Sequence, residues 1–110
     1  MFQVKIHLEK TSSLFKNLKK RGFLEDFDDT LFIWIKYKPA IGELIQITGN
    51  GRYSYEFQNY LNNRNKPIIL RITDLLYIHH NLNTNDNDGV NVLYLKCYED
   101  STINWWQRNP

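Results

Sequence analysis

The chain has 110 residues, of which 42% are hydrophobic and 24% charged, and its formal net charge is +2. This composition is that of a folded globular domain, and it excludes a disordered, collagen-like or coiled-coil chain. So small a net charge also argues against a dedicated duplex-DNA binder, which needs a strong positive field. Because a chain this short has room for one hydrophobic core, we expect a single domain over residues 1–110.

The apolar segments and the cysteine content indicate where the protein resides. The longest uninterrupted apolar run, residues 31–35, is far shorter than the roughly 20 residues that a membrane-spanning helix needs. The first ten residues contain no apolar block of the kind that forms a secretory signal. The single cysteine, Cys97, cannot form an internal disulfide. We therefore expect a cytoplasmic protein with no membrane partner.

The N-terminal segment predicts a strand followed by a short helix. Apolar and polar residues alternate from Phe2 to Leu8, which is the period of a strand with one buried face. Residues 12–21 place their apolar side chains on one side of a helix that Ser or Thr residues can cap, and Gly22 can end it. Basic side chains fill its last turns, where cations complement the helix dipole: Lys16, Lys19, Lys20 and Arg21.

Residues 30–38 predict a strand that is apolar on both faces. Leu31, Ile33 and Ile35 share one face, and Phe32 and Trp34 lie on the other. A strand of this kind is usually central and covered on both sides. We expect Pro39 to end the strand, since proline cannot donate to a ladder, and residues 39–43 to form a tight connection.

The segment Gly49-Asn50-Gly51 predicts a β-hairpin. A two-residue loop would place polar residues opposite Ile45 and Ile47. A three-residue loop, with a left-handed glycine, places Tyr53 and Tyr55 beside them instead. Because a slip of one residue moves every side chain to the other face, the hydrophobic pattern favours the three-residue loop. We therefore predict that these two tyrosines share a sheet face with the two isoleucines, around a Gly51 of positive φ.

Two further strands are predicted in the second half of the chain. Residues 58–66 are polar and form a loop or a frayed helical turn. Residues 68–80 form a long strand in which a bulge near Thr73-Asp74 keeps Leu75 and Tyr77 on the buried face. Residues 90–99 are again apolar on both faces. The expected fold is mainly β (α+β): a curved antiparallel sheet or small barrel of five or six strands with one short N-terminal helix.

The histidines are the candidate metal ligands or general bases. His79 and His80 are neighbours on a predicted strand, so their side chains point to opposite faces. His7 could join one of them across strands, with Asp74 or Glu99 as a third ligand. Nothing in the spacing requires such a site, and histidines facing solvent at a strand end are the favoured interpretation.

The other candidate chemical motifs are also absent or incomplete. Cys97 alternates in phase with Leu93 and Leu95, which predicts a buried and unreactive thiol. Residues 86–89 look like part of a calcium loop, but the acids needed at its first and last positions are missing. No phosphate-binding glycine loop or hydrolase motif is present. We therefore assign no cofactor, metal or catalytic residue, although a site built from distant residues would leave no such motif.

Two groups of residues are candidate binding sites. Aromatic side chains can anchor a protein partner, and the basic cluster of the helix can contact phosphate. The same cluster is also explained by the helix dipole, and the C-terminal tryptophan pair by a lid over the core. The aromatic candidates are Phe32, Trp34, Tyr94, Tyr98, Trp105 and Trp106, and the basic candidates are Lys16, Lys19, Lys20 and Arg21.

The favoured function is a small non-enzymatic protein-interaction module, an inhibitor or regulator, that binds through its aromatic-rich strand surface. A strand that is apolar on both faces needs a cover on both, and one short helix leaves the second face to another chain. That chain is another protein or a second copy in a homodimer. The alternative is a single-stranded nucleic-acid-binding protein that uses the basic helix and the aromatic strands. A fully buried Trp34 would favour this alternative.

Overall fold

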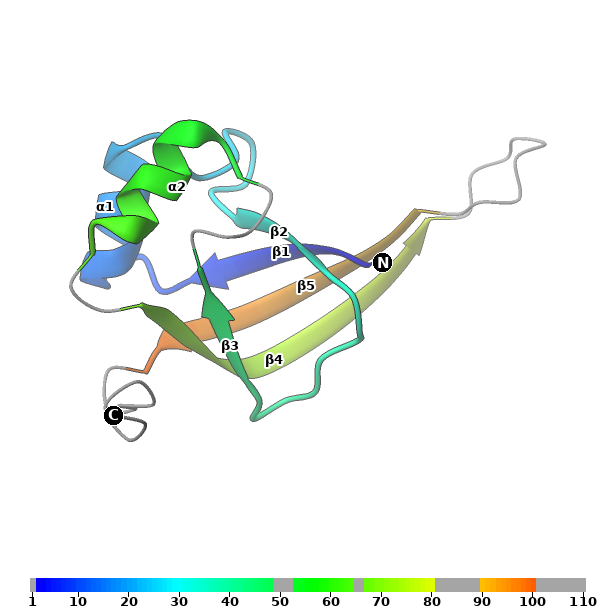
Figure 1. The fold of residues 1–110 in the computed structure, drawn as a ribbon. Coiled ribbons are helices and arrows are strands. Elements are labelled where there is room, and N and C mark those ends of the chain that lie inside the picture. Colours follow the sequence, from blue (N-terminus) through cyan, green and yellow to red (C-terminus); the bar gives the residue numbers. More distant parts are fainter. Residues whose placement is uncertain (1, 49–52, 65–66, 81–89, 101–110) are drawn as a thin grey trace.

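A single five-stranded sheet and two helices make up the computed structural model, which describes residues 2–48, 53–64, 67–80 and 90–100. The strand order is β2-β1-β5-β4-β3, and every neighbouring pair is antiparallel except the parallel pair β1 and β5 (Figure 1). This arrangement confirms the mainly β fold class. The elements are β1 Phe2–Leu8, α1 Ser13–Lys20, β2 Leu31–Ile35, β3 Leu44–Ile47, α2 Tyr55–Asn62, β4 Ile68–His80 and β5 Val90–Glu99.

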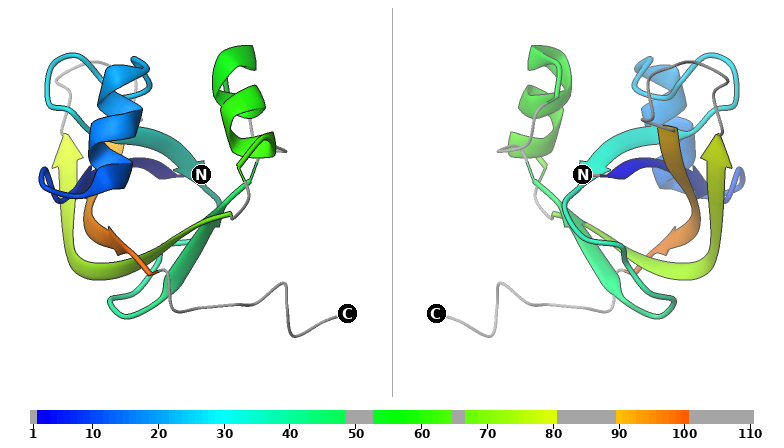
Figure 2. Two further views of the ribbon diagram at one scale, coloured as in Figure 1. Left: turned by 90° about the vertical axis from the view of Figure 1, so that its left-hand side faces the viewer. Right: turned by 90° about the vertical axis from the view of Figure 1, so that its right-hand side faces the viewer.

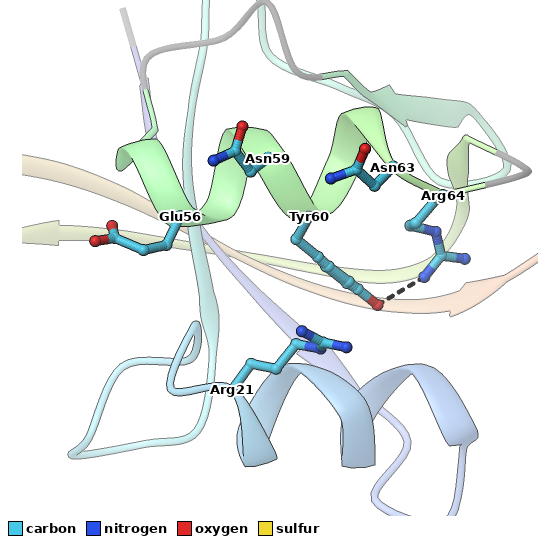
Figure 3. A pocket seen from close by; sticks show the side chains of 6 residues that line it. All are labelled: Arg21, Glu56, Asn59, Tyr60, Asn63 and Arg64. Atoms are coloured by element: carbon cyan, nitrogen blue, oxygen red, sulfur yellow. Dashed lines mark hydrogen bonds between the residues drawn. The ribbon is translucent and has the colours of Figure 1, made fainter.

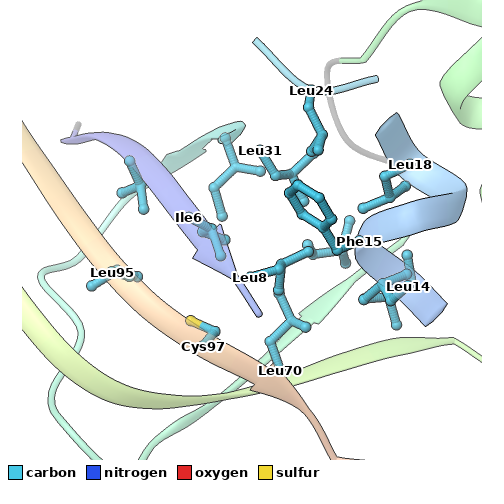
Figure 4. Close-up of a cluster of buried hydrophobic side chains, with 14 of the residues drawn as sticks. Ile6, Leu8, Leu14, Phe15, Leu18, Leu24, Leu31, Leu70, Leu95 and Cys97 are labelled. Carbon is cyan, nitrogen blue, oxygen red and sulfur yellow. The ribbon is translucent and has the colours of Figure 1, made fainter. Parts of the chain in front are cut away.

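The sheet curls into a half-barrel whose concave side is covered by both helices (Figure 2). We call this concave side the inner face and the convex side the outer face. The inner face carries fully buried side chains from the central strands, among them Ile6 and Leu95. Helix α1 packs onto them through Leu14, Phe15 and Leu18 (Figure 4). Since these side chains supply the apolar burial, the core lies between the sheet and the helices.

Helix α1 begins and ends as its sequence predicts. The Ser12 hydroxyl accepts a hydrogen bond from the Phe15 N–H at 3.1 Å, which caps the first turn. At the other end, the Gly22 N–H donates to the Lys19 carbonyl and the Phe23 N–H to the Leu18 carbonyl. This pair of hydrogen bonds requires a residue of left-handed conformation directly after the helix, and Gly22 has a φ of 76°.

The predicted hairpin is wrong, because the segment after β3 forms helix α2. Strand β3 pairs with β4, with Ile47 opposite Ile68 and Ile45 opposite Leu70. Tyr55 is the first residue of α2 and does not share a sheet face with the isoleucines. Ser54 caps the helix by accepting from the Phe57 N–H at 3.3 Å. Gly51 lies outside the described residues. The chain therefore has a second helix where we expected a strand and a loop.

The position of β2 also differs from the prediction, whereas the bulge in β4 is confirmed. β2 ends at Ile35 and lies at one edge of the sheet, so Trp34 stays 48% exposed and is not covered on both sides. In β4 the register shifts between Ile72 and Asp74, which places Leu75 opposite the buried Leu95. Tyr77, which we also expected to be buried, stands opposite Leu93 but is 41% exposed. Apolar residues on both faces therefore marked a central strand in β5. In β2 the same pattern occurs in an edge strand.

Candidate protein-binding face

The outer face is formed by the strand side chains that alternate away from the helices. Register places four of them side by side across four strands: Phe32 is beside Lys5, Lys5 is beside Tyr94, and Tyr94 is beside Leu76. Leu76 is 59% exposed, while Phe32 and Tyr94 are partly buried. An apolar row, interrupted by a single lysine, therefore crosses β2, β1, β5 and β4.

An aromatic pair stands at the β2 end of this row. The rings of Phe32 and Trp34 meet edge to face, with centroids 5.5 Å apart and planes at 88°. This geometry is the favourable one for two aromatic rings, and it restricts the rotamers of both side chains. Because Trp34 remains half-exposed while its neighbour holds it, this ring can enter a contact at a small cost in conformational entropy.

An open hollow of about 480 Å³ lies further along the outer face, between β1, β5 and β4. Its apolar walls come mainly from Leu76 and the ring of Tyr94. Leu75, whose side chain packs against the core of the inner face, also lines it, and the β4 bulge adjoins it. His7 stacks on Tyr94 at a centroid distance of 5.8 Å. The remaining lining residues are Asp74, Leu95 and Lys96. The hollow is therefore an apolar depression with a polar rim. Its size suits a side chain inserted by a partner protein.

Carboxylates match the cations of this face. The Lys5 ammonium lies 2.9 Å from Asp28, and the Arg71 guanidinium lies 3.0 Å from Asp100. Lys96 stands opposite Asp74 in the β4–β5 register. The outer face thus carries little uncompensated positive charge.

Asp28 links this face to the buried start of β2 and gives the protein a pH-dependent contact. Burial acts to raise the pKa of its carboxyl group, but hydrogen bonds from the Thr30 hydroxyl, at 2.6 Å, and from the Lys5 ammonium outweigh burial. The pKa of Asp28 is therefore lower than its ordinary value of 3.8. A lowered pKa in the folded state stabilises the fold above the unfolded-state pKa, and this contribution is lost as the pH falls through the folded-state pKa.

We expect Asp28→Asn to lower the free energy of unfolding by about 1 kcal/mol near neutral pH, because the amide keeps a partner for Thr30 but loses the ion pair with Lys5. The difference from the wild type should shrink in acidic solution below pH 3.8, the ordinary pKa of the carboxyl group, as the pH falls toward the lower folded-state pKa of Asp28. Urea denaturation near neutral pH and in acidic solution measures this difference in the free energy of unfolding. Asp26→Asn, the same change at an exposed position of the same loop, should have little effect; an equal loss in both variants would contradict the role of Asp28.

The structure brings only part of the predicted aromatic set together. Phe32, Trp34 and Tyr94 lie on one region of the outer face, as described above. Tyr98 is 44% exposed on the same face, but it lies beside Arg71, at the other end of β5. Trp105 and Trp106 lie outside the described residues. The sequence did not single out Leu76, and it singled out His7 only as a possible metal ligand or general base, because their place beside Tyr94 depends on strand order rather than on local pattern.

The basic cluster lies on the other side of the sheet from the aromatic strand residues. Lys16, Lys19 and Lys20 are exposed on α1, which covers the inner face. Lys19 also forms an ion pair of 3.1 Å with Asp29 in the acidic loop. The two groups therefore do not line one groove of the described structure. Arg21 instead lines a pocket between the two helices, together with residues of α2.

Within the described residues, the candidate metal ligands His7, Asp74 and Glu99 do not form one cluster. His7 is level with Asp74 across the sheet, whereas His79 lies five positions further along β4, or about 17 Å. The side chains of His79 and His80, and the loop 86–89, lie outside the described residues. Glu99 binds Arg64 at 3.0 Å. Among the residues that the structure describes, no three His, Cys, Asp or Glu side chains are grouped as metal ligands would be.

The predicted burial of Cys97 is confirmed. Its side chain is 3% exposed on the inner face, among the core residues in Figure 4. Burial raises the pKa of the thiol to about 12. At neutral pH the sulfur is therefore protonated, which is the weakly nucleophilic form.

Neither helix in the described part of the chain has the length and apolarity of a membrane span. Comparison with protein-family models, with curated proteins and with solved structures finds no match to this chain.

Proposed function

We propose that this chain is a non-enzymatic protein-interaction module, acting as an inhibitor or regulator, and that it binds its partner through the outer face of the sheet. The observation that supports this function is the half-exposed Trp34, held by Phe32, on the same face as an apolar hollow. Tryptophan anchors and apolar pockets are the features that concentrate binding energy in protein interfaces.

The charges of the outer face favour a protein partner over a nucleic acid. Binding to a phosphate backbone needs cations that release counterions, whereas Lys5 and Arg71 are already held by carboxylates. The basic helix, which the nucleic-acid alternative needs, lies on the other side of the sheet. A protein that inserts an apolar side chain into the hollow meets apolar walls at Leu76 and Tyr94 and a polar rim at His7.

The partner is another protein or a second copy of this chain, and both would use the same face. We also propose a cytoplasmic location, which is supported by the single cysteine of the chain. Sedimentation velocity of the pure protein distinguishes the two partners, because a second copy gives a dimer whose fraction rises with concentration. If the pure protein is a monomer, the partner is isolated from an extract of the source cell and identified by mass spectrometry.

Trp34→Ala is expected to weaken this association by about 2 kcal/mol, which is a roughly 30-fold rise in Kd. The matched control is Tyr55→Ala, which removes an aromatic ring that is 74% exposed on α2, away from the outer face. The control should leave the Kd within about twofold of the wild type. Equal effects of the two variants would contradict the proposal. So would an isolated complex that nuclease treatment dissolves, which would support the nucleic-acid alternative.

A further inference from the structure

A second pocket, separate from the outer face, lies between the end of α1 and the outward side of α2 (Figure 3). Its volume is about 580 Å³, which is within the range of small-molecule sites. It is lined by Arg21, Glu56, Asn59, Tyr60, Asn63 and Arg64. Two arginines, two amides and a phenol in one pocket form a donor-rich surface of the kind that recognises oxyanions.

Tyr60 organises the two arginines. Its ring is stacked with that of Phe23 at a centroid distance of 5.4 Å, so the ring itself is fixed. The Arg64 guanidinium donates to the Tyr60 hydroxyl oxygen at 2.8 Å and to the Glu99 carboxylate at 3.0 Å. The Arg21 guanidinium carbon lies 4.9 Å from the centroid of the same ring. Both guanidinium groups are therefore positioned at one aromatic side chain before any ligand binds.

Arg21 differs from Arg64 in what its donors contact. Arg64 is partly buried, and Glu99 offsets its charge. Arg21 is exposed, and within the described ranges its side chain has no ion pair or hydrogen bond, only the contact with the Tyr60 ring. Contact with an aromatic ring orients a guanidinium group without using its N–H donors. Arg21 therefore presents a preoriented fork of donors to the pocket.

We propose that this pocket binds a small phosphate monoester, with the phosphate group held by the Arg21 fork and by the hydroxyl proton of Tyr60. Arginine matches phosphate oxygens with two parallel hydrogen bonds. The Tyr60 oxygen already accepts from Arg64, which leaves its own proton to donate to the ligand.

Glu56 indicates the chemistry of the rest of the ligand. It lies eight residues before Arg64 along the direction of α2, or about 12 Å away on a helix, and in Figure 3 it stands at the other end of the pocket from Arg64. A carboxylate there repels a second phosphate and accepts hydrogen bonds from hydroxyl groups. Asn59 and Asn63, one turn apart between these ends, can bond hydroxyl oxygens and protons alike. The expected ligand is therefore a phosphate monoester with a hydroxylated body.

Isothermal titration of the full chain with ribose 5-phosphate tests this inference, with ribose, inorganic phosphate and an oligothymidylate without terminal phosphates as parallel probes. We expect saturable binding of ribose 5-phosphate with a Kd of about 1 mM or lower, weaker binding of inorganic phosphate and none of ribose. Arg21→Gln should raise the Kd at least about tenfold, because the fork is lost. Lys16→Gln, the same loss of charge on the exposed side of α1, should leave it within about twofold.

Each other outcome overturns the inference. No saturable binding of ribose 5-phosphate, or binding that both variants weaken equally, would show that the pocket does not use the Arg21 fork. Binding of the oligothymidylate alone would point to a nucleic-acid backbone instead of a monoester. Because Arg21 is exposed, its variant should keep the wild-type circular dichroism spectrum and melting temperature, which separates loss of binding from loss of fold.

Discussion

Replacing Leu95 by alanine is expected to lower the free energy of unfolding by about 3 kcal/mol. Leu95 is fully buried on the central strand β5, and it stands between Ile6 of β1 and Leu75 of β4 in the sheet register. Loss of its side chain removes apolar burial and leaves a cavity that strands paired on both sides can fill only in part. Urea denaturation followed by circular dichroism measures the change.

Leu76→Ala is the matched control for this prediction. It makes the same chemical change on the neighbouring strand, but Leu76 is 59% exposed on the outer face. We expect it to cost less than about 1 kcal/mol. If the two variants lost equal stability, or if Leu76→Ala lost more, the assignment of the inner and outer faces would be wrong.

Replacing Phe57 by alanine is expected to cost about 3 kcal/mol as well, because this ring attaches α2 to the rest of the fold. Phe57 is 4% exposed, and its ring meets those of Phe23 and Tyr53 edge to face at 4.8 and 4.9 Å. Aromatic pairs of this geometry contribute beyond their buried area. Tyr55→Ala, at an exposed position of the same helix, should cost less than about 1 kcal/mol.

A strand at residues 53–57 would give a different result. In the hairpin that the sequence favoured, Tyr55 would lie on the buried face. Phe57, two residues further along the strand, would lie on the same face. Loss of stability in Tyr55→Ala comparable to that in Phe57→Ala would therefore support the hairpin and contradict α2. Circular dichroism of the folded variants provides a second check, since detachment of α2 reduces the helical signal without unfolding the sheet.

Elements with a clear local period were predictable from the sequence. The alternation from Phe2 to Leu8 and the apolar stripe of α1 each fit one type of element. The bulge in β4 followed from a break in the alternation at Asp74, which would otherwise have put a carboxylate on the buried face. In these segments the residue pattern and the final packing require the same conformation.

Helix α2 was missed because its sequence fits two periods. Tyr53 and Tyr55 alternate as in a strand, and the preceding Gly-Asn-Gly segment favours a hairpin. Tyr53, Phe57 and Leu61 also recur every four residues, as on one side of a helix, and the structure buries Phe57 and Leu61. The signal that could have decided between them was Ser54, which is well placed to cap a helix.

The candidate binding face could be predicted only in part. Alternation showed that Phe32 and Trp34 lie opposite the buried residues of β2, but it could not show that β2 is an edge strand. The hollow beside Tyr94 exists because β1 pairs in parallel with β5, a contact between residues about ninety positions apart in the chain. Local pattern carries no signal for pairing of this kind. The pocket between α1 and α2 was missed because the packing of these two helices also leaves no signal in the local pattern.

The central claim, that the outer face binds a protein, is tested most directly by photo-cross-linking from that face in an extract of the source cell. The photoreactive amino acid p-benzoylphenylalanine is placed at Lys96, on the rim of the hollow, and at Tyr55 on α2 as the control position. We predict one protein adduct of defined mass from position 96, which is lost when Trp34→Ala is added, and none from position 55. No protein adduct from position 96, an equal adduct from both positions, or an adduct that Trp34→Ala leaves unchanged would contradict the claim.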